Sequence, residues 1–188
     1  MFRKLFFIFI IINLSFNLLA QDSKLYSFKS GMIKYKFEGR AAGVETVYFD
    51  DYGMLTSTFK TIYSELNNKS TCTIIKHDTI FELNINNHTI MANCLSDNFS
   101  GTKQNIISNE ALVVLGFFKS GVDIVAGKNC DKFSGNSGTL WVWNNIVLKS
   151  EMNILDKVTI TEASYVEMGI EISKSKFEIP KDYKIINQ

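Results

Sequence analysis

The residues with the chemistry to hold a metal ion are two histidines and a neighbouring acid. His77 and His88, with Asp78 nearby, could meet on neighbouring strands. A closed zinc site takes four protein ligands and a catalytic one usually three, and the chain has only these 2 histidines. Two histidines beside turns are more typical of solvated side chains, so we expect no metal site and no cofactor.

A glycine-rich segment resembles a phosphate-binding loop only superficially. Five residues instead of four separate Gly121 from Gly127, and Asn129 stands where a Ser or Thr would hold Mg²⁺. Ser137 lacks the spacing of a nucleophile elbow, and neither histidine is linked to a serine or cysteine by a known motif. Surface turns are the simpler interpretation of both stretches.

The acidic residues do not form a recognisable catalytic pair. They are scattered, as the positions of five glutamates show: Glu65, Glu82, Glu110, Glu151 and Glu162. The charges, 20 basic and 19 acidic, are interspersed without a basic run, which argues against nucleic-acid binding. A secreted hydrolase stays an alternative, but the sequence favours a protein that is not an enzyme.

The first twenty residues have the pattern of a secretory signal peptide. Arg3 and Lys4 precede an apolar run, and Ala20 precedes the polar Gln21. The alternative is a membrane anchor, but polar residues such as Asn13 interrupt the run before the roughly 20 residues that a span requires. We expect a signal peptide over residues 1–20, one domain over 21–188, no stable membrane span after cleavage, and a periplasmic or secreted protein.

Three cysteines cannot form a disulfide framework. Their odd number leaves either one bond and one free thiol or three thiols among Cys72, Cys94 and Cys130. We favour three partly buried thiols, because cysteine behaves as a small hydrophobic residue in strands.

A tryptophan-containing hairpin is the most informative structural signal. Asn144 and Asn145 separate two apolar runs, and both tolerate the positive φ of a two-residue type I′ turn. This turn pairs Trp143 with Ile146, Val142 with Val147, Trp141 with Leu148 and Leu140 with Lys149. One face then carries Trp141, Trp143, Ile146 and Leu148, and the other carries Leu140, Val142 and Val147. Because both faces are apolar, something must cover each of them.

The rest of the chain predicts two runs of antiparallel strands around one helix. Ile33, Tyr35 and Phe37 alternate with charged residues, as in a half-buried strand. Six strands are expected over 30–38, 44–49, 55–63, 72–76, 80–85 and 88–95, and a loop or weak edge strand over 97–105. A helix is expected over 109–120, capped by Ser108 and packed on the sheet. Pro180 indicates an edge or an extended exit segment.

The fold class is mainly β: a single curved antiparallel sheet, or incomplete β-barrel, of about ten to eleven strands covered by one inserted helix.

Several of these stretches together resemble the outer-membrane lipoprotein carrier and sorting (Lol-like) superfamily, and especially its small exported relatives of unknown function. The similar stretches, within residues 30–185, are GMIKYKF (31–37), YFDDYG (48–53), GKNCDKF (127–133), WVWNNIVLK (141–149) and FEIP (177–180). The resemblance implies an incomplete barrel enclosing an apolar cavity, with lipid or lipoprotein acyl chains as partners. Members carry more helical lid than the single segment expected here.

We therefore expect an exported, non-enzymatic envelope protein that binds a hydrophobic ligand or a lipidated partner. The apolar wall of its cavity is expected to be Trp141, Trp143, Ile146 and Leu148. The alternative is a structural or interaction module with a filled core and no ligand. A dry void of several hundred Å³, the scale typical of ligand sites, would separate the two.

Overall fold

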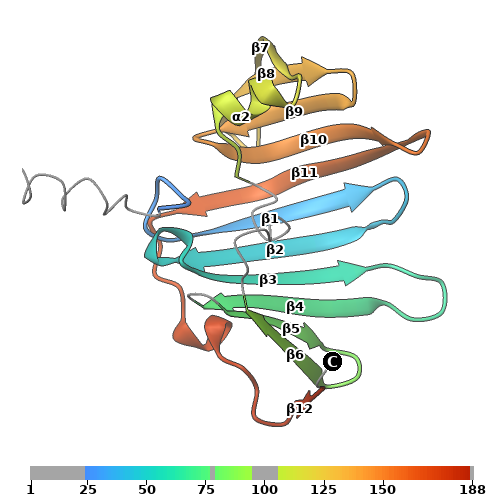
Figure 1. The fold of residues 1–188 in the computed structure, drawn as a ribbon, viewed down its shortest axis with the longest axis vertical. Helices are drawn as coiled ribbons and strands as arrows, with labels where there is room; N and C mark the ends of the chain where they lie inside the picture. The colour runs from blue at the N-terminus through green and yellow to red at the C-terminus, as the bar shows by residue number, and fades with distance from the viewer. Residues whose placement is uncertain (1–23, 77–78, 95–105, 187–188) are drawn as a thin grey trace, which may run out of the picture.

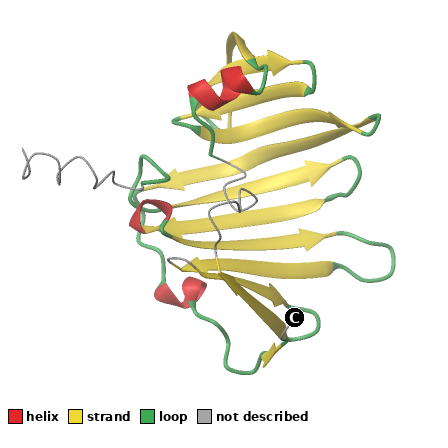
Figure 2. Cartoon of the chain, in the orientation of Figure 1, coloured by secondary structure: helices red, strands yellow, loops and turns green. Residues whose placement is uncertain are grey.

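The protein is built on one large curved sheet. The computed structural model describes residues 24–76, 79–94 and 106–186. The sheet has 12 strands in the order β12-β6-β5-β4-β3-β2-β1-β11-β10-β9-β8-β7 (Figure 1). Strands dominate the described chain, and the helical segments are short (Figure 2). The expected signal peptide, the His77–Asp78 turn and the segment 97–105 lie outside the described residues.

The first six strands form a continuous antiparallel meander, as predicted. They are β1 (Gly31–Glu38), β2 (Gly43–Asp50), β3 (Leu55–Ile62), β4 (Lys69–Lys76), β5 (Thr79–Asn84) and β6 (Thr89–Cys94), with a 3-10 turn η1 (Asp51–Gly53) between β2 and β3. The alternation predicted for β1 is confirmed, because Ile33 and Tyr35 are buried while Lys34 and Lys36 are exposed.

The second meander follows a short helix, α2 (Asn109–Val114). Its strands are β7 (Phe118–Val125), β8 (Lys128–Gly135), β9 (Gly138–Trp143), β10 (Ile146–Ile154) and β11 (Lys157–Met168). A 3-10 turn, η3 (Lys174–Phe177), and a last short strand, β12 (Lys184–Ile185), come after it. Strand β11 pairs with β1 and so joins the two meanders, while β12 pairs with β6 in the parallel direction. The predicted fold class is confirmed, but the strand count rises to 12 and one pair is parallel.

The helix is shorter than predicted because part of its apolar sequence belongs to a strand. Ser108 caps it as expected, with its Oγ accepting a hydrogen bond from the Ala111 backbone N–H at 3.2 Å. The chain then leaves the helix through Gly116, whose φ of +78° suits glycine. The residues from Phe118 onwards pair with β8 instead of continuing the helix to residue 120.

The turn of the tryptophan hairpin is confirmed, but its register changes after two pairs. Asn144 and Asn145 have φ values of 47° and 64°, and Trp143 and Val142 pair as predicted. A bulge at Leu148 then shifts the ladder, so the predicted partners of Trp141 and Leu140 are wrong. Trp141 pairs with Lys149, and Leu140 pairs with Ser150.

Despite this shift, the two predicted apolar sets lie in different cores. The first core contains Trp141, Ile146 and Leu148, with Trp143 packed against it, together with Tyr35 and other buried residues. The second contains Leu140 and Val142 with Val147 beside them, and is covered by Leu112 of α2 and by Phe117. Both faces of the hairpin are therefore covered.

The sheet curls strongly at its β7 end. Three strands separate β7 from β11 in the sheet order, yet Cα atoms of the two strands approach within 8 Å. The N-terminal segment also joins the first core, where the Tyr26 ring stacks on Phe49 with centroids 3.9 Å apart and Phe28 stacks on Trp143 at 5.2 Å.

The C-terminal segment covers a third core on the first meander. Ile179 and Tyr183 pack against a cluster that includes Cys72, Ile74 and Leu83. Pro180 lies in the extended stretch between η3 and β12, in agreement with the predicted exit segment.

Candidate ligand-binding cavity

A cavity of about 660 Å³ opens between the two meanders. Its described lining residues are Phe37, Arg40, Ala41, Glu45, Lys60, Ile62, Ile106, Ile107, Leu140, Val147, Ser150, Met152, Thr159 and Thr161. Strands β1, β2, β3, β9, β10 and β11 all contribute to it. The volume falls in the range of about 300–1,000 Å³ that is typical of small-molecule sites.

The segment before α2 forms one apolar wall and is held by the tryptophan hairpin. Ile106 forms an antiparallel bridge with Ile146, and the Ile107 backbone N–H donates to the Asn145 carbonyl at 2.8 Å. Ile107 also packs beside the second core. The hairpin thus places both isoleucines against the sheet.

The strands position the opposite wall through their registers. Phe37 pairs with Thr161, Thr161 pairs with Ser150, and Ser150 pairs with Leu140, so these four residues form one row across β1, β11, β10 and β9. Directly opposite residues of antiparallel strands project on the same face. The row brings an aromatic residue of the first meander and an aliphatic one of the second into the same cavity.

Two lining residues form an ion pair at the first meander. The Lys60 Nζ lies 3.6 Å from the Glu45 Oε2, and the ammonium also lies 4.8 Å from the centre of the Phe37 ring. The Lys60 side chain is 40% exposed and that of Glu45 16%. Because each charge faces a partner, this pair adds little net charge to the cavity.

Two further polar lining residues, Arg40 and Thr159, belong to the end of the cavity at the β1–β2 turn. Arg40 is exposed in this turn, and the Oγ1 of Thr159 is buried without a hydrogen-bond partner among the described residues. Glu38, the last residue of β1, pairs with Ile160, so the backbone that follows β1 lies beside Thr159. The cavity therefore combines apolar walls with a cationic and a hydroxyl group at one end.

None of the four residues predicted as the apolar wall is among the lining residues of this cavity. Trp141 is 4% exposed, and Ile146 and Leu148 are fully buried in the first core, where Trp143 is half-buried. Whether any of them contacts a ligand stays a prediction. Sequence reasoning placed Leu140 and Val147 on the other face of the hairpin, and that face supplies part of the cavity.

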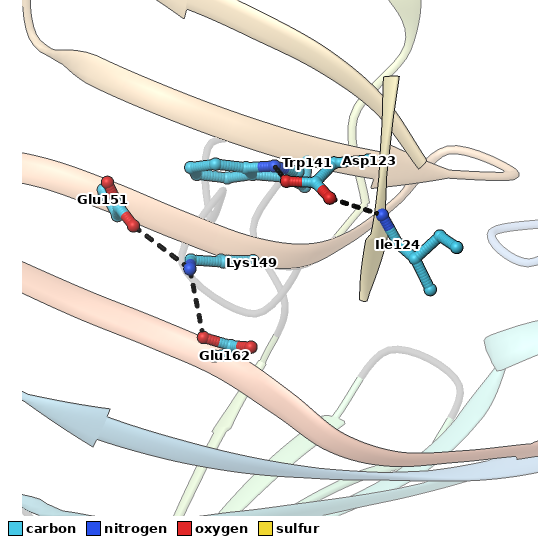
Figure 3. Close-up of polar contacts among 6 residues, drawn as sticks. All are labelled: Asp123, Ile124, Trp141, Lys149, Glu151 and Glu162. Atoms are coloured by element: carbon cyan, nitrogen blue, oxygen red, sulfur yellow. Dashed lines mark hydrogen bonds and ion pairs between the residues drawn. The ribbon is translucent and has the colours of Figure 1, made fainter. Parts of the chain in front are cut away.

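Trp141 instead occupies a dense polar and cationic setting (Figure 3). Its Nε1–H donates to the Asp123 Oδ2 at 3.2 Å, and the Lys149 ammonium lies 4.9 Å from the centre of its ring. Lys149 also lies 3.1 Å from Glu151 and 3.2 Å from Glu162. The Ile124 N–H and the Trp141 indole hold the pKa of the Asp123 carboxyl below its usual value. These contacts tie β7, β9, β10 and β11 together.

The groups considered for catalysis are not assembled into a site. Ser137 lies in the exposed turn between β8 and β9, and His88 is exposed, with its Nε2 4.0 Å from Asp182. No cluster of three or more His, Cys, Asp or Glu residues suited to a metal ion occurs within residues 24–76, 79–94 and 106–186. Cys72 and Cys130 are buried free thiols, and burial raises the pKa of each.

No protein-family model and no curated protein matches the chain. Solved structures do match it. An uncharacterised conserved protein from Thermus thermophilus is 11% identical with a TM-score of 0.56, and the match covers 84% of this chain and 90% of that one. The Pseudomonas aeruginosa MucA/MucB complex gives 8% identity and a TM-score of 0.51, over 85% of this chain and 58% of the matched chain. This chain thus spans less than two thirds of the matched chain of that complex.

The likeness is one of fold. A LolA superfamily protein from Nitrosomonas europaea is also among the matches, at 11% identity over 84% of this chain and 93% of that one, although its TM-score of 0.37 is too low to support a detailed comparison. The matches to the Thermus thermophilus protein and to the MucA/MucB complex, at 11% and 8% identity, show a shared fold, in agreement with the open curved sheet that the Lol-like resemblance implied. Among the helices of the described segments, none is both long and apolar enough to cross a membrane.

Proposed function

We propose that this protein is an exported, non-enzymatic envelope protein that holds a hydrophobic chain in its cavity. The observation that carries the proposal is the cavity of about 660 Å³ itself, whose walls are largely apolar and come from both meanders. Its outer wall, the segment at Ile106 and Ile107, is attached to the tryptophan hairpin by backbone hydrogen bonds. Binding would remove apolar ligand surface from water without rebuilding the sheet.

The energetics give the proposal a measurable signature. Burying one methylene group contributes about 0.8 kcal/mol, which corresponds to roughly a fourfold change in affinity. Affinity for straight-chain alcohols should therefore rise by about this factor per carbon and stop rising when the cavity is full. Non-specific adsorption to the protein surface would give no such limit and no fixed stoichiometry.

The test is calorimetric titration of the purified protein with alcohols of increasing chain length, with native mass spectrometry to count the bound molecules. We expect one molecule per chain. Ile62→Trp, which would fill the cavity from β3, should weaken binding at least tenfold. The matched control is Val44→Trp on β2, at a half-buried position that is not among the lining residues, and it should bind as the parent does.

A second pair of variants tests the wall predicted from the sequence. Met152 lines the cavity, whereas Leu148 is buried in the first core. If the cavity is the site, Met152→Ala changes affinity more than Leu148→Ala does, although Leu148→Ala destabilises the fold by about 2–5 kcal/mol. The reverse order would support Trp141, Trp143, Ile146 and Leu148 as the ligand wall.

The alternative function is an interaction module without a small ligand. Two observations favour it: the first core is filled, with Ile146 and Leu148 fully buried, and the matched MucB structure is a complex with MucA. In that case neither alcohols nor other hydrocarbon-chain ligands bind saturably, and the protein acts by contact with a protein partner. Absence of saturable binding in the titrations above would decide for this alternative.

A further inference from the structure

We propose that the cavity selects a hydrocarbon-chain ligand with a carboxylate head group, and that Arg40 and Thr159 bind this head group at the β1–β2 turn. The inference rests on the proposed function and adds the ligand class. It predicts that the ligand is a fatty acid, ionised at neutral pH, and not a neutral hydrocarbon chain.

The first supporting observation is the hydroxyl of Thr159. Its Oγ1 is buried and has no hydrogen-bond partner in the described part of the chain. Buried polar groups in proteins almost always have partners, so such an atom in a cavity wall points to a missing one. A ligand oxygen that accepts the hydroxyl proton would supply it.

The second observation is the balance of charge at this end. Lys60 is paired with Glu45 at 3.6 Å, whereas Arg40 has no ion pair among the described residues. The net charge that the described lining residues offer a ligand is therefore positive and belongs to Arg40. A guanidinium binds a carboxylate through two parallel N–H donors, which makes it well suited to this head group.

The third observation places the two groups together. A Cβ added to Gly39 would lie 3.2 Å from the Thr159 Oγ1, so the backbone of this turn packs directly against that hydroxyl. Gly39 has φ +120°, a conformation that favours glycine, and Arg40 follows it. The close packing brings Arg40 to the end of the cavity where Thr159 lies.

The registers of the strands indicate the direction in which the ligand's tail would run. Thr159 pairs with Met152, and the next row towards the hairpin contains Thr161, Ser150 and Leu140. Val147 lies beyond that row. A carboxylate at Thr159 would thus extend its tail past Met152 towards Leu140, Val147 and Ile107.

The test compares three ligands with the same tail: dodecanoate, dodecanol and dodecyl phosphate, each titrated into the purified protein at low salt. We expect dodecanoate to bind at least tenfold more tightly than dodecanol. Arg40→Gln and Thr159→Val should each weaken dodecanoate binding more than dodecanol binding and so reduce that preference. Arg40→Lys keeps the positive charge but loses the two parallel N–H donors of the guanidinium, so it should retain part of the preference for dodecanoate.

The controls separate head-group recognition from damage to the fold. Lys181→Gln removes an exposed cation after Pro180, outside the lining residues, and should change nothing. Thr159→Ser keeps the hydroxyl and should bind dodecanoate as the parent does. Thermal unfolding of each variant shows that it is folded.

Each outcome decides a different point. Equal binding of dodecanoate and dodecanol, unaffected by Arg40→Gln, overturns this inference and leaves the proposed function intact. Failure of all three ligands to bind overturns both. Tighter binding of dodecyl phosphate that is lost in Arg40→Gln overturns the assignment of a carboxylate.

Discussion

At the scale of single residues, the hairpin turn has the clearest conformational requirement. Asn145 has φ 64°, a left-handed conformation that costs a β-branched residue about 1–2 kcal/mol. Asn145→Val should lower the free energy of unfolding by about this amount, and Asn145→Gly should be neutral or mildly stabilising. Urea denaturation of the purified variants measures both effects.

The matched control is Asn129→Val, at an exposed position of β8 that does not have positive φ. Valine suits an extended strand, so this change should cost little. An Asn145→Val variant as stable as the parent would contradict the need for positive φ at this turn.

The buried tyrosines make stability sensitive to alkaline pH. Burial, with smaller contributions from Tyr26 and Glu45, raises the pKa of Tyr35 well above its usual value, and its hydroxyl donates to the Val147 carbonyl at 3.1 Å. Because the neutral form is favoured in the folded state, its contribution is complete below the unfolded pKa of about 10 and is lost as pH rises through the folded pKa.

Tyr35→Phe should therefore cost about 1 kcal/mol near neutral pH, from the lost hydrogen bond. Above about pH 10 the variant should lose stability less steeply than the parent. Urea midpoints over this pH range test the prediction, with the exposed Tyr63→Phe as a control. Identical slopes for Tyr35→Phe and the parent would show that Tyr35 does not govern the alkaline loss.

At the scale of elements, the C-terminal segment protects a buried thiol. Phe177 of η3 is 3% exposed, and the residues after it cover the core that holds Cys72. Phe177→Ala should cost about 3–5 kcal/mol and loosen this cover. Since thiol reactivity depends on access and on the thiolate form, Cys72 should then be labelled faster by a thiol reagent, as followed by peptide mass spectrometry.

Phe118→Ala serves as the comparison, because Phe118 is 63% exposed on the edge strand β7. It should change neither stability nor labelling of Cys72. Equal labelling of Cys72 in Phe177→Ala and the parent would mean that the C-terminal cover does not limit access to this core.

At the scale of the whole molecule, the sheet order predicts a gradient of local stability. Strands β2, β1 and β11 lie in the middle of the 12 strands, whereas β7 and the two-residue β12 form the edges. Backbone amides of the central strands should exchange with solvent most slowly, and those of the edges fastest. Hydrogen exchange read by mass spectrometry checks this order, and protection of β7 equal to that of β1 would contradict it.

The local features of the fold could be predicted from the sequence. The alternation of Ile33 and Tyr35 with lysines defined β1, Asn144 and Asn145 defined the hairpin turn, and Ser108 defined the start of the helix. Each depends on φ preferences or on the two-residue period of a strand, which are properties of neighbouring residues.

The end of the helix, the bulge and the cavity depend instead on tertiary contacts. The segment after Gly116 is apolar enough for either a helix or a strand, and pairing with β8 selected the strand. The bulge at Leu148 moved the partners of Trp141 and Leu140 by one residue. The cavity joins Phe37 to Leu140 through two intervening strands. The helix end and the bulge depend on which strands pair, and the cavity depends on contacts between residues more than a hundred positions apart, such as Phe37 and Thr161. The local pattern does not determine such pairing.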